Sequence, residues 1–256
     1  MDRVREMPPE RAEAPAPTGE AVGVRPRAEA RPAMAEPVIE NRVQENIFLQ
    51  PLAAPSILGL YGFSGATFVV AAGLIGWYTS GAAVVVFPFA AFFGGLAQFL
   101  AGMWAYRARD GLATAMHGMW GAFWMSYGVL FLLFALGVLS ETAVALVGLG
   151  WWFIPLGFIT LSGATAATRV SWALFSVLVL LGSGSGIAAA GFIGSDRFVQ
   201  SVAGWVFLFS AIAAWWTATG LMFEQFFGRS ILPLGARKAK PKVTLGPYEP
   251  GVIRGQ

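Results

Sequence analysis

One long stretch of the sequence is almost without charge, and this feature limits the folds that the chain can adopt. Of the 17 basic and 14 acidic residues in the chain, residues 57–223 contain only seven: Arg107, Arg109, Asp110, Glu141, Arg169, Asp196 and Arg197. A water-soluble fold of this size needs polar side chains at helical or strand periodicity to cover its surface, and the stretch shows no such pattern. The sequence therefore predicts a membrane protein.

Six apolar runs lie within this stretch. A hydrocarbon core about 30 Å thick is crossed by about 20 helical residues. We expect spans at 57–78, 82–104, 116–139, 142–161, 172–193 and 199–223. The runs are continuously apolar rather than alternating, which disfavours a β-barrel. The predicted fold class is an all-α polytopic membrane protein with six transmembrane helices per protomer.

Composition divides the chain into three parts. Residues 1–46 are rich in Pro, Ala, Glu and Arg and contain almost no aliphatic runs, so we expect a disordered tail. Residues 47–235 would form the six-helix membrane domain. Residues 236–256 would form a second, basic tail.

The basic residues near the predicted spans indicate the orientation of the chain. With six spans, both termini share a side with loops 105–115 and 162–171. That side carries nearly all of the basic residues close to the membrane, and the other side carries only Arg197. This bias predicts that both termini are cytoplasmic. It also accounts for the basic tail, so we expect no binding of nucleic acid.

Several chemistries are excluded by composition. The chain has no Cys, which excludes disulfides, thiolate metal sites and a cysteine nucleophile. Its single His excludes a zinc site that needs two histidines from one protomer. We therefore expect no metal site, no cofactor and no enzymatic activity.

Small and polar residues recur on one face of two predicted spans. In the second span, Gly94, Gln98 and Gly102 are spaced by four residues. This face is either a packing seam with an interhelical hydrogen bond or a wall of a polar passage lined by Gln98. In the first span, the same spacing relates Gly59, Phe63 and Thr67, and it allows the same two interpretations.

Two further features lie in the third and fifth spans. His117 is either an interfacial residue bonded to a neighbour or a proton carrier, because histidine ordinarily titrates near pH 6.5. The glycine-rich run at 182–186 is either a broken helix or a site of close helix packing, and we favour close packing.

The interior of the predicted bundle lacks fixed charge. Glu141, Asp196 and Glu224 all fall at the ends of spans, and no Lys or Arg lies in the middle of one. A solute inside would be coordinated by hydroxyls, the Gln98 amide, backbone dipoles and aromatic faces. This environment favours a small monocarboxylate over a multiply charged acid.

Several motifs, in this order and spacing, resemble the acetate uptake transporter family, which includes succinate–acetate permeases. They are Ala-Pro-Ser-Ile-Leu-Gly-Leu at 54–60, Phe-Phe-Gly-Gly-Leu-Ala-Gln-Phe-Leu-Ala-Gly at 92–102, Gly-Ala-Phe-Trp at 121–124, and Gly-Arg and Leu-Pro-Leu-Gly at 228–235. The resemblance covers about residues 50–235 and implies that the membrane domain is a transporter domain.

The resemblance implies a homohexamer in the inner (plasma) membrane with a separate path through each protomer. The transported solute would be acetate, a similar short-chain monocarboxylate or succinate, moved by proton-linked or channel-like permeation. The family's constriction falls on Phe63, on Trp120 in place of a Tyr, and on Leu178 or the adjacent Val177. The residues expected along the path are Pro55, Leu58, Gly59, Phe63, Thr67, Gln98, Trp120 and Leu178, with His117 as a candidate proton carrier.

The sequence also departs from the family pattern. Ala54 and Ile57 replace an Asn and a Pro of the opening motif, and Trp120 adds bulk at the constriction. Two alternatives therefore stand beside transport of acetate: a non-transporting membrane scaffold with a plugged path, and a channel for a small neutral solute such as ammonia or urea.

Overall fold

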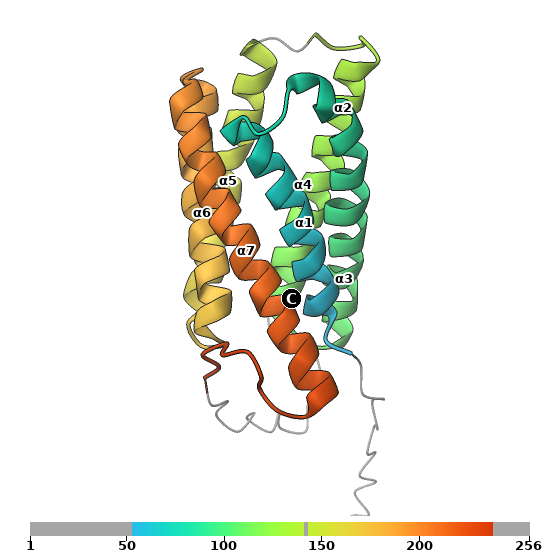
Figure 1. The fold of residues 1–256 in the computed structure, drawn as a ribbon, viewed down its shortest axis with the longest axis vertical. Coiled ribbons are helices and arrows are strands. Elements are labelled where there is room, and N and C mark those ends of the chain that lie inside the picture. The colour runs from blue at the N-terminus through green and yellow to red at the C-terminus, as the bar shows by residue number, and fades with distance from the viewer. Residues whose placement is uncertain (1–52, 141–142, 238–256) are drawn as a thin grey trace, which may run out of the picture. The chain divides into compact units, whose positions relative to one another are not determined.

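A computed structural model describes residues 53–140 and 143–237, so most of the two predicted tails lies outside the described residues. The described chain is nearly all helical (Figure 1). Its elements are α1 (Pro55–Ile75), α2 (Ser80–Phe89), the π-helix η1 (Ala90–Leu96), α3 (Ala97–Arg107), α4 (Gly111–Ala135), α5 (Ala143–Ala167), α6 (Trp172–Ile193) and α7 (Arg197–Phe227).

Six helices of the described residues are long and apolar enough to cross a membrane, which confirms the predicted number. The second of these spans is built from α2, η1 and α3 in succession. The third begins at Gly111, five residues before the predicted start at 116, because Asp110 caps it. The Asp110 carboxylate accepts a hydrogen bond from the Ala113 N–H at 2.9 Å.

The π-helix in the second span was not predicted from the sequence. It begins at Ala90, two residues after Pro88, and Pro88 lacks the backbone N–H that a regular α-helix needs. Hydropathy alone does not distinguish an α-helix from a π-helix, so the apolar run could not indicate it.

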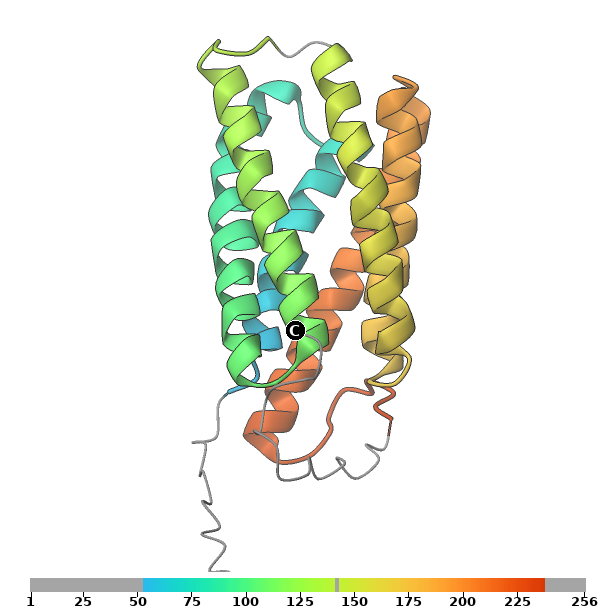
Figure 2. The same cartoon turned by 180° about the vertical axis from the view of Figure 1, so that it is seen from behind.

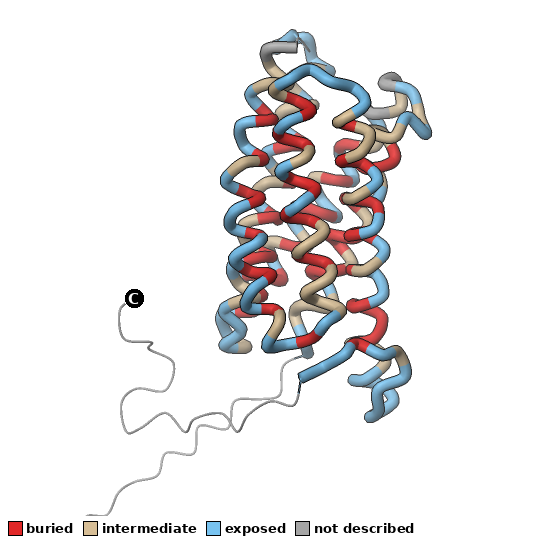
Figure 3. The backbone as a smooth tube through the Cα atoms, turned by 90° about the vertical axis from the view of Figure 1, so that its left-hand side faces the viewer, coloured by how far each residue is buried: buried red, intermediate tan, exposed pale blue. Residues whose placement is uncertain are grey.

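The helices pack so that the first and last spans lie side by side. α1 packs along α7, α7 along α6, and α6 along α5, whereas α3 and η1 pack on α4 and α1 (Figures 1 and 2). α1 begins and α7 ends at the same end of the bundle, the lower end in Figure 1. Buried positions face inward all along the helices, and exposed ones cover the outside (Figure 3). Large apolar side chains such as Phe89 and Trp152 are exposed there, as expected of a surface in contact with lipid.

Glycines let the second and third spans approach closely. A Cβ atom on Gly102 would lie 2.6 Å from the Gly118 backbone nitrogen, and one on Gly121 would lie 2.5 Å from the Phe99 nitrogen. The glycines of this face therefore form a packing seam. α6 likewise runs unbroken through 182–186, where Gly184 packs against Phe207, so the glycine-rich run serves close packing as favoured.

After α7, the chain turns back and docks on the start of α6. The backbone N–H of Trp172 donates to the Gly235 carbonyl at 3.2 Å, and the Arg237 guanidinium lies 4.8 Å from the centre of the Trp172 ring. Leu234 is buried in contact distance of the Gly220 position. We call residues 233–237 the docked segment, and it crosses the predicted boundary at 235.

Candidate functional site

Three cavities follow one another through the six-helix bundle. The lower cavity, of about 50 Å³, lies at the start of α4, and the upper cavity, of about 360 Å³, lies near the end of α1. A central cavity of about 20 Å³ lies between them. The names refer to the lower and upper ends of the bundle in Figure 1. The lower and central cavities share Trp120 and Leu181 as lining residues. The central and upper cavities share Val70, Leu74, Tyr127 and Phe192. The shared walls make the three cavities a single line from one end of the bundle to the other.

The lower cavity opens near the loop that precedes α4 and contains most of the polar side chains. Ser56, Gln98, Asp110 and His117 line it. The Gln98 Nε2 atom lies 3.4 Å from His117 Nδ1, so the amide can donate to the ring, and both side chains are buried. Gly59 makes this arrangement possible, because a Cβ atom there would lie 2.5 Å from the His117 ring.

Aromatic and aliphatic side chains narrow the line between the lower and central cavities. The Phe63 and Trp120 rings meet edge to face, with centroids 6.4 Å apart and planes at 66°. Leu178 and Leu181 of α6 line the lower cavity with them. Phe63 and Trp120 are each only 2% exposed, so the constriction is enclosed by protein.

A hydrogen bond to α5 fixes the orientation of Trp120, although α5 contributes no residue to the constriction. The Trp120 indole Nε1 donates to the Thr160 hydroxyl of α5 at 3.0 Å, and that hydroxyl donates to the Leu156 carbonyl at 2.6 Å. The polar edge of the indole is therefore satisfied, and the apolar part of the ring faces the cavities.

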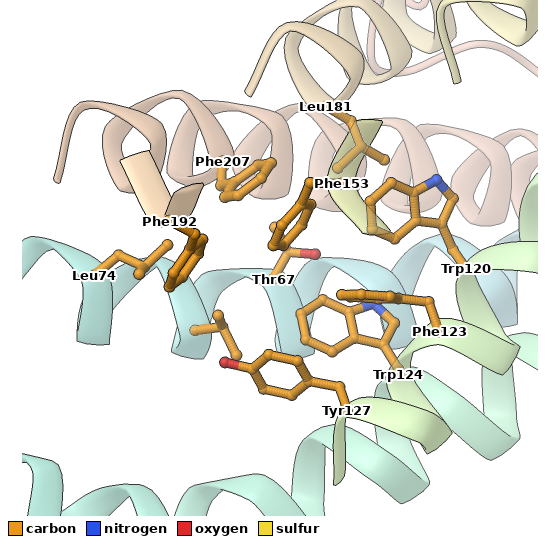
Figure 4. Close-up of a pocket in the computed structure, with 11 residues that line it drawn as sticks. Thr67, Leu74, Trp120, Phe123, Trp124, Tyr127, Phe153, Leu181, Phe192 and Phe207 are labelled. Carbon is orange, nitrogen blue, oxygen red and sulfur yellow. The ribbon is translucent and has the colours of Figure 1, made fainter. Parts of the chain in front are cut away.

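The central cavity is a ring of apolar side chains with two unsatisfied polar atoms (Figure 4). Thr67 and Trp124 line it, and they are 2% and 4% exposed. The Thr67 Oγ1 and Trp124 Nε1 atoms have no hydrogen-bond partner in the part of the chain that the structure describes. A buried polar group without a partner costs about 1–3 kcal/mol, so two at one small cavity require an explanation.

The upper cavity is the largest and carries a positive charge. Arg197 lines it, and its guanidinium donates to the Gln200 side-chain oxygen at 3.2 Å. Tyr78 lines it as well and donates its hydroxyl to the Val69 carbonyl at 2.9 Å. Burial raises the pKa of Tyr78, so the phenol remains neutral and keeps this bond.

The structure gathers six of the nine predicted site residues around the cavities. They are Phe63, Thr67, Gln98, His117, Trp120 and Leu178, and Val177 lines the lower cavity together with Leu178. Pro55, Leu58 and Gly59 are not among the lining residues. Pro55 begins α1, Leu58 is 46% exposed, and Gly59 lies against the His117 ring.

Four residues that matter to the geometry were missed in the sequence: Trp124, Thr160, Leu181 and Arg197. Helical spacing could have found two of them, since Trp124 follows Trp120 by four residues and Leu181 follows Leu178 by three. Thr160 and Arg197 belong to the geometry only through the fold.

Comparison with known proteins supports the resemblance inferred from the motifs. Residues 41–233 match the GPR1/FUN34/yaaH family. The chain is 27% identical over 186 residues to the succinate-acetate/proton symporter SatP of Escherichia coli (strain K12). This alignment covers 72% of this chain and 96% of the symporter. It is 29% identical over 172 residues to the meiotically up-regulated gene 86 protein of Schizosaccharomyces pombe, over 64% of this chain and 56% of that protein.

A solved structure gives the same result for the fold. The structure of the bacterial acetate channel SatP has a TM-score of 0.67 to this chain at 26% sequence identity, and the match covers 72% of this chain and all of that one. The predicted resemblance and the all-α, six-span fold class are confirmed. The chain belongs to the GPR1/FUN34/yaaH family.

Proposed function

We propose that this protein moves acetate and closely related short-chain monocarboxylates across a membrane, through a path inside each protomer. The observation that carries the proposal is the line of three cavities through the bundle, which ends at a different mouth on each side. Two relatives support the choice of solute, since they are named as a succinate-acetate/proton symporter and as an acetate channel.

The chemistry of the cavity walls favours a small acid with one carboxyl group. Among the described residues, the charged side chains that line the cavities are Asp110 in the lower one and Arg197 in the upper one. The central cavity is lined by uncharged side chains and has room for about one water molecule at rest. A dicarboxylate such as succinate would have to shed more hydration without a compensating cation, so we expect it to move more slowly than acetate.

Orientation and assembly follow from the same proposal. The positive-inside bias supports cytoplasmic termini, and the lower cavity would then open to the cytoplasm. The family resemblance supports a homohexamer in the inner (plasma) membrane. The role is transport and not catalysis.

A driving force is needed for net uptake of an anion. An inside-negative membrane potential opposes each entering charge by about 2.3 kcal/mol per 100 mV. A proton that moves with the acid removes this cost. The proton can travel on the undissociated acid or through His117, which lines the lower cavity beside Gln98.

Uptake of radiolabelled acetate into proteoliposomes tests the proposal. We expect uptake well above that of empty vesicles and inhibition by excess unlabelled acetate, propionate or formate. Uptake of labelled urea or ammonia, with no uptake of acetate above that of empty vesicles, would instead indicate a channel for neutral solutes.

The buried Trp120 ring favours one other candidate, a scaffold whose path is plugged at the constriction. Such a protein would give no uptake above empty vesicles, and replacing Trp120 by Ala would open it. Acetate uptake by the unaltered protein rejects the scaffold.

A further inference from the structure

The two unsatisfied polar atoms of the central cavity differ from the other buried polar groups nearby. The buried hydroxyls of Ser185 and Thr217 donate to backbone carbonyls four residues earlier in their own helices, at 2.8 and 2.7 Å. Ser64, on the same helix as Thr67, donates to the Ala211 carbonyl of α7 at 2.8 Å. The Thr67 hydroxyl makes no such bond and is left free to face the cavity.

The same contrast holds for the two indoles at the cavity. Trp120 and Trp124 lie one helical turn apart on α4 and both line the central cavity. The Trp120 N–H is used by Thr160, whereas the Trp124 N–H has no acceptor among the described residues. In Figure 4 the Thr67 oxygen and the Trp124 nitrogen lie among the aromatic rings of the cavity, and no side-chain acceptor or donor labelled there pairs with them.

These two groups complement one chemical class. An indole N–H only donates, and a threonine hydroxyl both donates and accepts. A carboxyl group presents two oxygens, one of which can accept from Trp124 while the other bonds to Thr67. Because the hydroxyl can act in either direction, the pair suits both the carboxylate and the undissociated acid.

We propose that Thr67 and Trp124 form a binding site for the carboxyl group of the permeating acid, midway along the path. This inference rests on the proposed function and adds the residues that recognise the solute. The small cavity of about 20 Å³ has room for about one water molecule, and the carboxyl group would take that place. The surrounding rings of Phe123, Phe153 and Phe207 would then enclose the short alkyl part of the acid.

The test is the concentration dependence of acetate uptake by variants in proteoliposomes. Thr67→Val keeps the shape of the side chain and removes the hydroxyl. We expect the KM for acetate to rise about tenfold, because one hydrogen bond to the acid is lost. The maximal rate should stay within about twofold of the wild type. Thr67→Ser should restore the KM. Trp124→Phe removes the N–H and should also raise the KM.

A matched control separates binding from packing. Thr217→Val removes an equally buried hydroxyl that is bonded within its own helix and does not line the cavities, so its KM should equal that of the wild type. If Thr67→Val and Thr217→Val have the same KM, or Thr67→Ser does not restore it, the carboxyl site is wrong while acetate transport stands. Absence of uptake by the wild type would instead overturn the proposed function.

Discussion

The indole nitrogen of Trp120 and the hydroxyl oxygen of Thr160 lie 3.0 Å apart and form a hydrogen bond between α4 and α5. Both side chains are buried. α4 and α5 otherwise make few contacts compared with α5 and α6. This bond therefore ties the constriction to a helix that contributes no other part of it.

Replacing Thr160 by Val should loosen the constriction. The Trp120 N–H would lose its acceptor in a buried position, which lowers the free energy of unfolding by about 1–3 kcal/mol. Thermal denaturation of the purified protein measures this effect. Ser162→Ala is the control, because that hydroxyl bonds within α5 and is exposed. Equal stability of the two variants would contradict the importance of the bond.

Trp120→Ala should widen the passage. The large ring shared by the lower and central cavities is removed, so we expect more uptake of longer acids such as lactate by the variant than by the wild type. Competition of lactate with labelled acetate measures the change. Trp152→Ala, on the exposed surface, should leave the substrate profile unaltered. An unchanged profile in folded Trp120→Ala would show that Trp120 does not set the width.

The proton-linked route predicts that acetate uptake rises as the external pH falls from 7 to 5. His117→Gln removes the titrating ring and keeps a polar side chain beside Gln98. The variant should lose the pH dependence if the proton passes through His117 and keep it if the acid enters undissociated. Uptake that does not depend on pH in either protein rules out both routes.

Arg197→Gln should slow the capture of acetate at the upper mouth. The guanidinium lines the upper cavity, the largest of the three along the line, and attracts anions. Added salt shortens the range of this attraction. We expect uptake by cells at low acetate concentration to fall about two- to fivefold at low ionic strength and the difference to vanish at high salt. Arg107→Gln changes the net charge equally at the other end of the bundle, at the end of α3. If both variants behave alike, Arg197 has no specific role at the mouth.

Two glycines should respond in opposite ways to a methyl group. Gly102→Ala forces the Cβ atom to 2.6 Å from the Gly118 nitrogen, and such overpacking costs about 1–3 kcal/mol. Gly186→Ala has nothing within 4 Å of the new atom and gains about 1 kcal/mol from helix propensity. Melting temperatures of the two variants should therefore move apart, and equal shifts would reject the packing seam.

The six spans could be predicted because hydropathy measures how apolar a segment is, and a helix that crosses a bilayer must be apolar along about 20 residues. Hydropathy does not give the exact start of α4 at Gly111, because the cap at Asp110 lies in a polar segment. The π-helix after Pro88 was not predicted, because a continuously apolar run has the same hydropathy whether it forms an α-helix or a π-helix.

The site was predicted in part for similar reasons. Spacing put Phe63 and Thr67 on one helical face but left open whether that face packs or lines a path, and both residues line the cavities. The free hydroxyl of Thr67 was not foreseeable, because a helical threonine normally bonds a carbonyl one turn back. Only the packing of neighbouring helices determines that the Trp120 indole is satisfied and the Trp124 indole is not.

The docked segment also fixes where the chain leaves the membrane domain. The Arg237 backbone N–H donates to the Val170 carbonyl at 2.9 Å, and Val170 lines the lower cavity. A fluorescent reporter joined directly after Arg237 would therefore be held beside the opening of the lower cavity. A reporter fused at this position would hinder the passage of solutes into the lower cavity. A long spacer between Arg237 and the reporter would remove this hindrance.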